Sequence, residues 1–129
     1  MKFSLIELPK LSPILILRTG LGLTLLYASL HMLFDTTSWI GFVPQWMETI
    51  MSARAFLIIH ALFQLILSAL LIWDFSLPAA SLLTFLDFVG ILIFYGVDDI
   101  TFRDFGLAMA ALALFALVIN PQKEEEKKV

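Results

Sequence analysis

Long apolar runs alternate with short polar turns along the chain. Four runs dominate the pattern, over 13–33, 53–73, 79–97 and 105–120. Because an α-helix rises about 1.5 Å per residue, each run is about long enough to cross a hydrocarbon core of roughly 30 Å. The pattern therefore predicts a single all-α membrane domain, a bundle of four transmembrane helices, with a polar tail over 121–129.

The connection between the first two runs is too apolar for a solvated loop. From Pro44 onward, apolar and polar residues recur with the spacing of an amphipathic helix, and proline suits the first helical turn. Trp39 and Trp46 favour the level of the lipid headgroups. We therefore predict a short interfacial helix over about 44–52. It is either a membrane-seated connection with no further role or a docking surface for an external partner.

Composition and charge agree with a membrane protein. The chain is 60% hydrophobic and 15% charged, with a mean hydropathy of +0.96, whereas soluble domains are about a quarter charged. The net charge of −3 and the lack of a large basic patch argue against nucleic acid as a partner. With no cysteine, disulfides, thiolate catalysis and Cys-ligated clusters are excluded.

The distribution of basic residues predicts the orientation of the chain. Loops rich in Lys and Arg usually stay on the cytoplasmic side. Arg54 and Arg103 lie on one side of the four runs, whereas the other side carries more basic residues: Lys2, Lys10, Lys123, Lys127 and Lys128. We expect a multi-pass protein of the cell membrane with both termini in the cytoplasm.

Polar side chains inside the apolar runs form three stripes. Ionisable residues within a membrane are costly and usually face protein or water. Spacings close to one helical turn put several of them on one helix face. The stripes are His60, Gln64 and Ser68 on the second run, Thr84, Asp87, Tyr95 and Asp98 on the third, and Arg18, Gly22 and Ser29 on the first. They form either a polar seam that orders the bundle or a small cavity or proton-conducting cluster.

Asp87 stands near the middle of its run and needs a partner. Counted from Pro78 it lies roughly 13 Å deep, and Arg18 lies roughly 7 Å deep on the same side, a difference that the long guanidinium stem covers. An unpaired charge at such depth is disfavoured. We therefore predict an ion pair between Arg18 and Asp87 with Gln64 alongside. Its first role would be structural, fixing which helices meet, and a proton-handling role of Asp87 would be secondary.

A ligand pocket is predicted in the outer half of the bundle. His60, Gln64 and Tyr95 share inward faces at neighbouring depths, and aromatic residues nearby could cover an apolar ring such as a quinone. These aromatic residues are Phe63, Phe94 and Trp39. Ordinary core packing is the competing interpretation of the same residues.

Charged residues crowd the turn before the last run, in "DDITFRD". We expect Arg103 to pair with one of the acids Asp98, Asp99 and Asp104, which would fix how the last helix leaves the third. The alternative is a solvated face whose ion pair contributes only about 0–1 kcal/mol.

The sequence offers one candidate for a metal or catalytic site, a haem site, and it is disfavoured. His31 and His60 are candidate haem ligands, since two imidazoles on neighbouring helices can hold one iron. Their depths differ by roughly 10 Å at about 1.5 Å per residue, and His31 points away from the polar stripe of its run. The sequence has no nucleophile–base pair, metal triad or phosphate loop, so no catalytic residue is identified and we do not expect catalysis by this chain alone.

Three segments resemble the DoxX family of small four-helix membrane proteins: "LRTGLGLTLLYASLHMLFD", "HALFQLILSALLIW" and "DDITFRDFGLAMAALAL". The family is named for a membrane subunit associated with quinone-linked oxidation, including thiosulfate:quinone oxidoreductase. The resemblance implies an accessory subunit of a respiratory or quinone-linked oxidoreductase, which anchors partner subunits, or copies of itself, and helps form a quinone or lipid pocket. Many relatives carry Glu where this chain has Gln64, so a proton role there is in doubt or has passed to Asp87 or His60.

Two functions of other classes stay open. One is a membrane scaffold or chaperone-like protein without a ligand. The other is a small transporter, which four short helices favour less because they enclose little volume.

Overall fold

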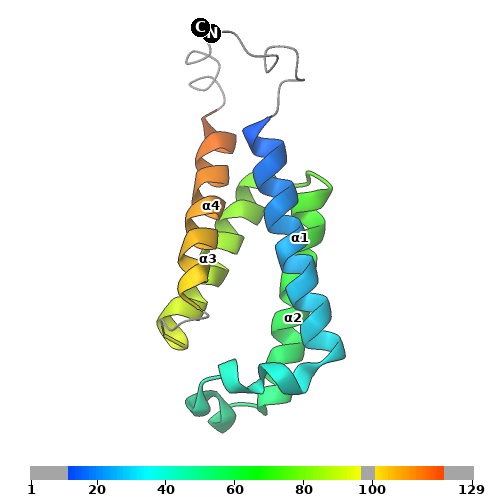
Figure 1. The fold of residues 1–129 in the computed structure, drawn as a ribbon, viewed down its shortest axis with the longest axis vertical. Helices are drawn as coiled ribbons and strands as arrows, with labels where there is room; N and C mark the ends of the chain where they lie inside the picture. The colour runs from blue at the N-terminus through cyan, green and yellow to red at the C-terminus, as the bar shows by residue number, and fades with distance from the viewer. Residues whose placement is uncertain (1–11, 97–100, 121–129) are drawn as a thin grey trace, which may run out of the picture.

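The structure, a computed structural model, describes residues 12–96 and 101–120, and these are arranged as a bundle of four α-helices (Figure 1). The helices are α1 (Pro13–Phe34), α2 (Ala53–Ile72), α3 (Leu77–Phe94) and α4 (Phe102–Ile119). Each is long and apolar enough to cross a membrane. The predicted four-helix membrane fold is confirmed, and the chain is a multi-pass membrane protein. The start of α1 and the end of α4 lie at the same end of the bundle.

Local sequence signals set where the helices begin. Ser12 accepts a hydrogen bond from the Leu15 backbone N–H at 3.3 Å, and Pro13 follows in the first turn of α1. Ser52 caps α2 in the same way, accepting from the Ala55 N–H at 3.1 Å. Serine before a helix satisfies an N–H that has no partner inside the helix, and proline fits the first turn because its missing N–H costs nothing there. The helices α1 and α2 therefore begin at the predicted residues, 13 and 53.

The connection between α1 and α2 is helical, as predicted, but it is not one continuous helix over 44–52. The connection instead folds as two short 3₁₀ helices, η2 (Thr36–Phe42) and η3 (Gln45–Thr49). Pro44 and the residue before it, Val43, are both extended, with ψ of 140° and 126°. Proline disfavours helical backbone in its predecessor, so the helical pattern is interrupted there. Together η2 and η3 cross the end of the bundle opposite the start of α1 and the end of α4 (Figure 1), and we call them the floor.

The bundle consists of two helical hairpins. The first hairpin, α1 with α2, and the second hairpin, α3 with α4, are each packed far more closely internally than against one another. Gly22 allows the close approach of α1 to α2, since a Cβ at this position would lie 2.6 Å from Ile72 Cγ1. Small residues at helix contacts commonly permit such packing in membranes.

The hairpins meet at only one end of the bundle. One buried cluster joins all four helices around residues such as Leu25, Leu71, Ala80 and Leu114. A second cluster, around Met32 and the start of α2, contains no residue of α3 or α4. The hairpins therefore diverge toward the floor, as Figure 1 shows.

Candidate functional site

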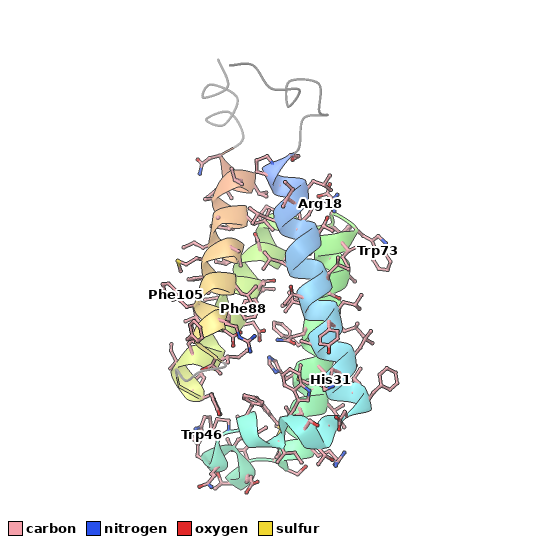
Figure 2. The ribbon with its side chains drawn as sticks, in the orientation of Figure 1. Arg18, His31, Trp46, Trp73, Phe88 and Phe105 are labelled. Atoms are coloured by element: carbon pink, nitrogen blue, oxygen red, sulfur yellow. The ribbon has the colours of Figure 1, made fainter. Side chains whose placement is uncertain are left out.

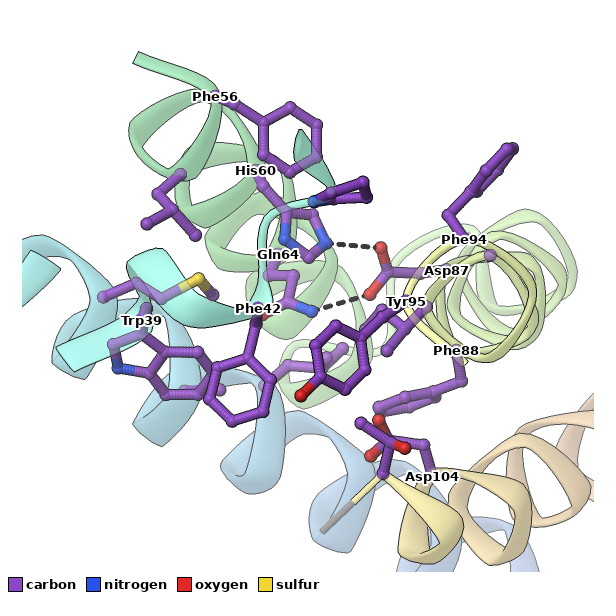
Figure 3. A pocket seen from close by; sticks show the side chains of 18 of the residues that line it. Trp39, Phe42, Phe56, His60, Gln64, Asp87, Phe88, Phe94, Tyr95 and Asp104 are labelled. Atoms are coloured by element: carbon purple, nitrogen blue, oxygen red, sulfur yellow. Dashed lines mark hydrogen bonds and ion pairs between the residues drawn. The ribbon is translucent and has the colours of Figure 1, made fainter. Parts of the chain in front are cut away.

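Asp87 is held by two side chains of α2. His60 Nε2 lies 2.7 Å from Asp87 Oδ1, and Gln64 Nε2 donates to Asp87 Oδ2 at 2.6 Å (Figure 3). His60 and Gln64 are four residues apart, so both project from the same face of α2. The carboxylate is 7% exposed, and a buried charge of this kind is stable only when it is hydrogen-bonded. We call these three residues the Asp87 cluster; it links the two hairpins where they begin to diverge.

The predicted ion pair between Arg18 and Asp87 is wrong. Arg18 donates instead to the backbone carbonyls of Leu71 at 3.1 Å and Ile72 at 2.7 Å. These carbonyls end α2 and have no partner within the helix, and the negative end of the helix dipole attracts a cation. Figure 2 shows Arg18 at the end of the bundle where α1 begins. Gln64 lies beside Asp87 as predicted, but His60 occupies the place expected for Arg18.

A cavity of about 870 Å³ lies between the diverging hairpins, and the Asp87 cluster forms part of its wall. Of the six residues predicted to form a pocket, five line this cavity: Trp39, His60, Gln64, Phe94 and Tyr95. The prediction for Phe63 is wrong, because its side chain lies outside the cavity and is 38% exposed. Phe63 precedes Gln64, and a step of one residue turns a side chain by about 100° around the helix.

Aromatic contacts between the floor and the end of α3 border the cavity. Phe42 of η2 packs against Tyr95 with ring centroids 5.2 Å apart, and Trp46 of η3 packs against Phe94 at 5.7 Å. Ring pairs at such distances attract one another beyond the effect of burying their area. These two pairs connect the floor, which continues the first hairpin, to the end of α3 in the second.

His31 also lines the cavity, contrary to the expectation that it points away from the interior. Trp39 Nε1 donates to His31 Nδ1 at 2.7 Å. The chain turns back after α1, so the floor brings the Trp39 indole against the last turn of the helix. Because Nδ1 accepts, the proton of the neutral imidazole is on Nε2.

Four aromatic residues of the wall were not predicted from the sequence to line a pocket: Phe42, Trp46, Phe56 and Phe88. Phe42, Phe56 and Phe88 line the cavity together with the residues named above (Figure 3). Phe56 stacks on His60 with ring centroids 5.9 Å apart, and its position one turn before His60 was a usable signal. Phe42 gave no such signal, because its place depends on the path of the floor.

The charged turn before α4 is described only in part. Asp98 and Asp99 lie outside the described residues. Arg103 and Asp104 lie near the start of α4, and both line the cavity. Both have interactions with other groups. The predicted ion pair of Arg103 with one of the acids stays a prediction.

One polar atom of the Asp87 cluster, the side-chain oxygen of Gln64, has no hydrogen-bond partner among the described residues. The residue is 3% exposed, and its Oε1 is buried without a hydrogen-bond partner in the described part of the chain. The amide cannot simply be reversed, since its oxygen would then face the carboxylate oxygen of Asp87 at 2.6 Å, where Nε2 now donates. A buried acceptor without a donor is costly. The amide oxygen of Gln64 is therefore an unsatisfied acceptor enclosed by the atoms around it.

The chemistry available to the site is hydrogen bonding and proton exchange beside an apolar surface. Within residues 12–96 and 101–120, no three His, Asp or Glu side chains are grouped as a metal ion would require. His60 and Asp87 share a proton-bearing hydrogen bond whose donor depends on the state of the imidazole. The wall around them is mainly aromatic and aliphatic.

Comparisons with family models, with curated proteins and with solved structures give no match for this chain. The likeness to the DoxX family therefore rests on the three quoted segments and stays a prediction.

Proposed function

We propose that this chain is an accessory membrane subunit of a respiratory or quinone-linked oxidoreductase, and that it holds a quinone-class ring in the cavity between its hairpins. One observation carries the proposal: the Asp87 cluster lies in the wall of a mainly apolar, aromatic cavity of about 870 Å³. Small-molecule sites typically combine such walls with a few convergent polar groups, at volumes of roughly 300–1,000 Å³.

The place of the cavity favours a ligand that dissolves in lipid. Its walls come from all four helices, each apolar enough to cross a membrane. Asp87 precedes the end of α3 at Phe94 by about two turns, which places the carboxylate roughly 10 Å from the end of the helix. A ring with oxygen substituents would meet aromatic side chains along its faces and the Asp87 cluster at one edge.

Electron transfer is assigned to a partner protein. Reducing a quinone to a quinol takes two electrons and two protons, and thiols cannot supply the electrons because the chain has no cysteine. In this proposal the chain binds the ring, and His60 with Asp87 exchanges a proton at a ligand oxygen. The basic residues near the termini support an orientation with both ends in the cytoplasm of the cell, which turns the floor outward.

The test is purification in mild detergent followed by extraction of quinones and mass spectrometry of retained lipids and proteins. Gly90→Leu fills the cavity, since Gly90 lines it and has open space around its Cβ direction. Gly106→Leu is the matched control, because Gly106 has equally open space but lies outside the cavity. We expect wild type and the Gly106 variant to retain quinone and the Gly90 variant to lose it.

A different result would support the scaffold interpretation. If wild-type protein retains no quinone, binds none when it is added and co-purifies with no redox partner, the proposed function is wrong. Equal retention by the two glycine variants would place any bound quinone outside this cavity.

A further inference from the structure

His31 presents a hydrogen-bond donor in the cavity wall, outside the Asp87 cluster. Its imidazole lines the cavity, and its Nδ1 accepts from the Trp39 indole at 2.7 Å. An indole nitrogen can only donate, so Nδ1 must accept and the proton of the neutral imidazole is on Nε2. This N–H has no acceptor in the described part of the chain. It is therefore available to a molecule in the cavity.

Exposure distinguishes this donor from the unsatisfied oxygen of Gln64. Among side chains of the described residues that are at least partly buried, Gln64 Oε1 is the one polar atom that is both enclosed and without a partner. His31 is half-buried, yet its Nε2 is not enclosed in this way. A ligand can therefore reach the N–H of His31, whereas the oxygen of Gln64 is closed off.

Two ring contacts and one hydrogen bond hold the imidazole in place. Trp39 meets it edge-on with ring centroids 5.8 Å apart, in addition to the hydrogen bond. Tyr27, one turn earlier in α1, stacks on it at 5.9 Å. The bond made by one ring nitrogen sets the tautomer of the other. Because its direction and tautomer are fixed in advance, the donor loses little conformational entropy when it binds an oxygen.

A second N–H of the wall, Trp46 Nε1, is less suited to hold a ligand. Trp46 lines the cavity but is 48% exposed, and it belongs to the floor, at a level where tryptophan commonly meets headgroups and water. Its ring packs against Phe94, and no hydrogen bond within the described residues fixes the direction of its N–H. An N–H that water reaches gains little from a ligand oxygen, since one hydrogen bond replaces another.

An aromatic surface extends from His31 toward α3. Trp39 packs against Phe42 with ring centroids 5.8 Å apart, and Phe42 packs against Tyr95 at 5.2 Å. Figure 3 shows these three rings side by side along the cavity. His31 lies in the last turn of α1, next to the floor, whereas His60 lies about two turns into α2. A planar ring bonded to His31 would therefore have aromatic faces beside it and the Asp87 cluster at another part of its edge.

Building on the proposed function, we infer that His31, positioned by Trp39, donates its Nε2–H to a carbonyl oxygen of the quinone-class ligand. The contact favours rings that carry an oxygen over hydrocarbons of the same shape. His31 keeps its proton in this contact, so it binds and orients the ring, while proton exchange stays with the Asp87 cluster.

Infrared spectroscopy of a bound ring tests the hydrogen bond directly. A short-tailed benzoquinone with ¹³C-labelled carbonyls is bound to the full chain in detergent, and the spectrum with unlabelled quinone is subtracted to isolate the carbonyl bands. We expect a band at lower frequency than the same quinone gives in detergent micelles alone, because a hydrogen bond weakens the C=O bond. This lowered band should be lost in His31→Phe.

Calorimetric titration measures how much the contact contributes to affinity. His31→Phe should weaken quinone binding by about tenfold, as expected for one hydrogen bond in an apolar site, and should change the binding of the matching alkylbenzene little. His31→Gln offers an amide N–H and should restore part of the loss.

Trp39→Phe tests the positioning role, because it keeps a ring but removes the indole N–H. The imidazole is then free to change tautomer, so quinone affinity should fall by about 2–10-fold and the lowered carbonyl band should weaken. Nitrogen-15 NMR should show part of the His31 population with the proton on Nδ1, a change that a purely structural role would not produce. Trp73→Phe is the matched control, since Trp73 is 78% exposed and lies outside the cavity.

The results distinguish failure of this contact from failure of the proposed function. If wild-type protein binds the quinone but His31→Phe keeps the lowered band, or if Trp46→Phe removes it instead, the His31 contact is wrong and the quinone site stands. Equal affinity of wild-type protein for quinone and alkylbenzene would overturn recognition of the carbonyl. If folded wild-type protein binds no ring compound, both proposals are wrong. Should His31→Phe not fold, an unchanged band and affinity in Trp39→Phe would overturn the inference.

Discussion

His60 Nε2 lies 2.7 Å from Asp87 Oδ1, and this contact joins two hairpins at the level where they begin to separate. His60 belongs to α2 and Asp87 to α3, which are packed much less closely than the helices within each hairpin. A hydrogen-bonded charge in a low-dielectric interior cannot be left without its partner at small cost. The pair therefore stabilises the contact between the two hairpins, in addition to any role in the proposed site.

Removing one partner of this pair should be worse than removing both. We expect Asp87→Leu to lower the free energy of unfolding in detergent by about 2–5 kcal/mol, because His60 and Gln64 lose their shared acceptor. The double variant His60→Leu with Asp87→Leu should lose less than the sum of the single effects. Leu83→Ala is the control on α3, since Leu83 is 40% exposed and lies outside the cavity. Additive single effects would contradict the coupling.

Arg18 should act independently of Asp87. Arg18→Leu removes two hydrogen bonds to the end of α2, and we expect a loss of about 1–3 kcal/mol in unfolding free energy. Arg18→Lys should restore part of it, since a cation remains near the helix terminus. A double-mutant cycle with Asp87→Leu, read by thermal unfolding, should be additive within about 0.5 kcal/mol. Strong coupling between the two sites would instead favour a direct ion pair.

Gly22 should be sensitive to a single added methyl group. Its Cβ would lie 2.6 Å from Ile72 Cγ1, so Gly22→Ala forces α1 and α2 apart or displaces Ile72. We expect a loss of about 1–3 kcal/mol, typical of overpacking. Combining it with Ile72→Ala should recover part of the loss. Gly20→Ala is the matched control, as Gly20 has nothing within 4 Å of its Cβ position; equal effects of the two alanines would refute tight packing at Gly22.

The floor should control access to the cavity. The chain lacks cysteine, so Thr24→Cys places a single thiol in the cavity wall. Phe42→Ala removes the ring pair with Tyr95, and we expect labelling of this thiol by a polar reagent to be about 2–10 times faster, given about 0.5–1.5 kcal/mol for an aromatic pair. A thiol at exposed Thr49 should react at the same rate in both backgrounds. Unchanged labelling of the cavity thiol would show that the floor does not limit access.

The orientation in the membrane follows from the basic residues near the termini. Reporter fusions after 129 and within the floor should report opposite sides, with the end of the chain in the cytoplasm. Reversing the Lys and Arg balance, by adding lysines to the floor and removing Lys123, Lys127 and Lys128, should weaken this preference. A wild-type chain with its end outside the cytoplasm would refute the assignment.

The sequence by itself determined the four spans and placed two of the three residues of the Asp87 cluster on one helix face. Runs long enough to cross a bilayer must be helical, because every backbone group needs a partner inside lipid. The spacing of four residues was enough to put His60 and Gln64 on one face of α2. Ser12 and Ser52 cap the first turns of α1 and α2, so local sequence fixes where these two helices begin.

Only the tertiary structure decided which polar groups meet. Depth along a helix follows from counting residues, but the sideways position of one helix relative to another does not, and so Arg18 was assigned to the wrong acceptor. Its actual acceptors are backbone carbonyls at the end of α2, which carry no signal in the sequence. The place of Phe42 and the inward position of His31 likewise depend on the path of the floor, which Pro44 divides into two short helices. The cavity exists because the hairpins diverge, and that divergence is a balance of packing among all four helices rather than a property of any one segment.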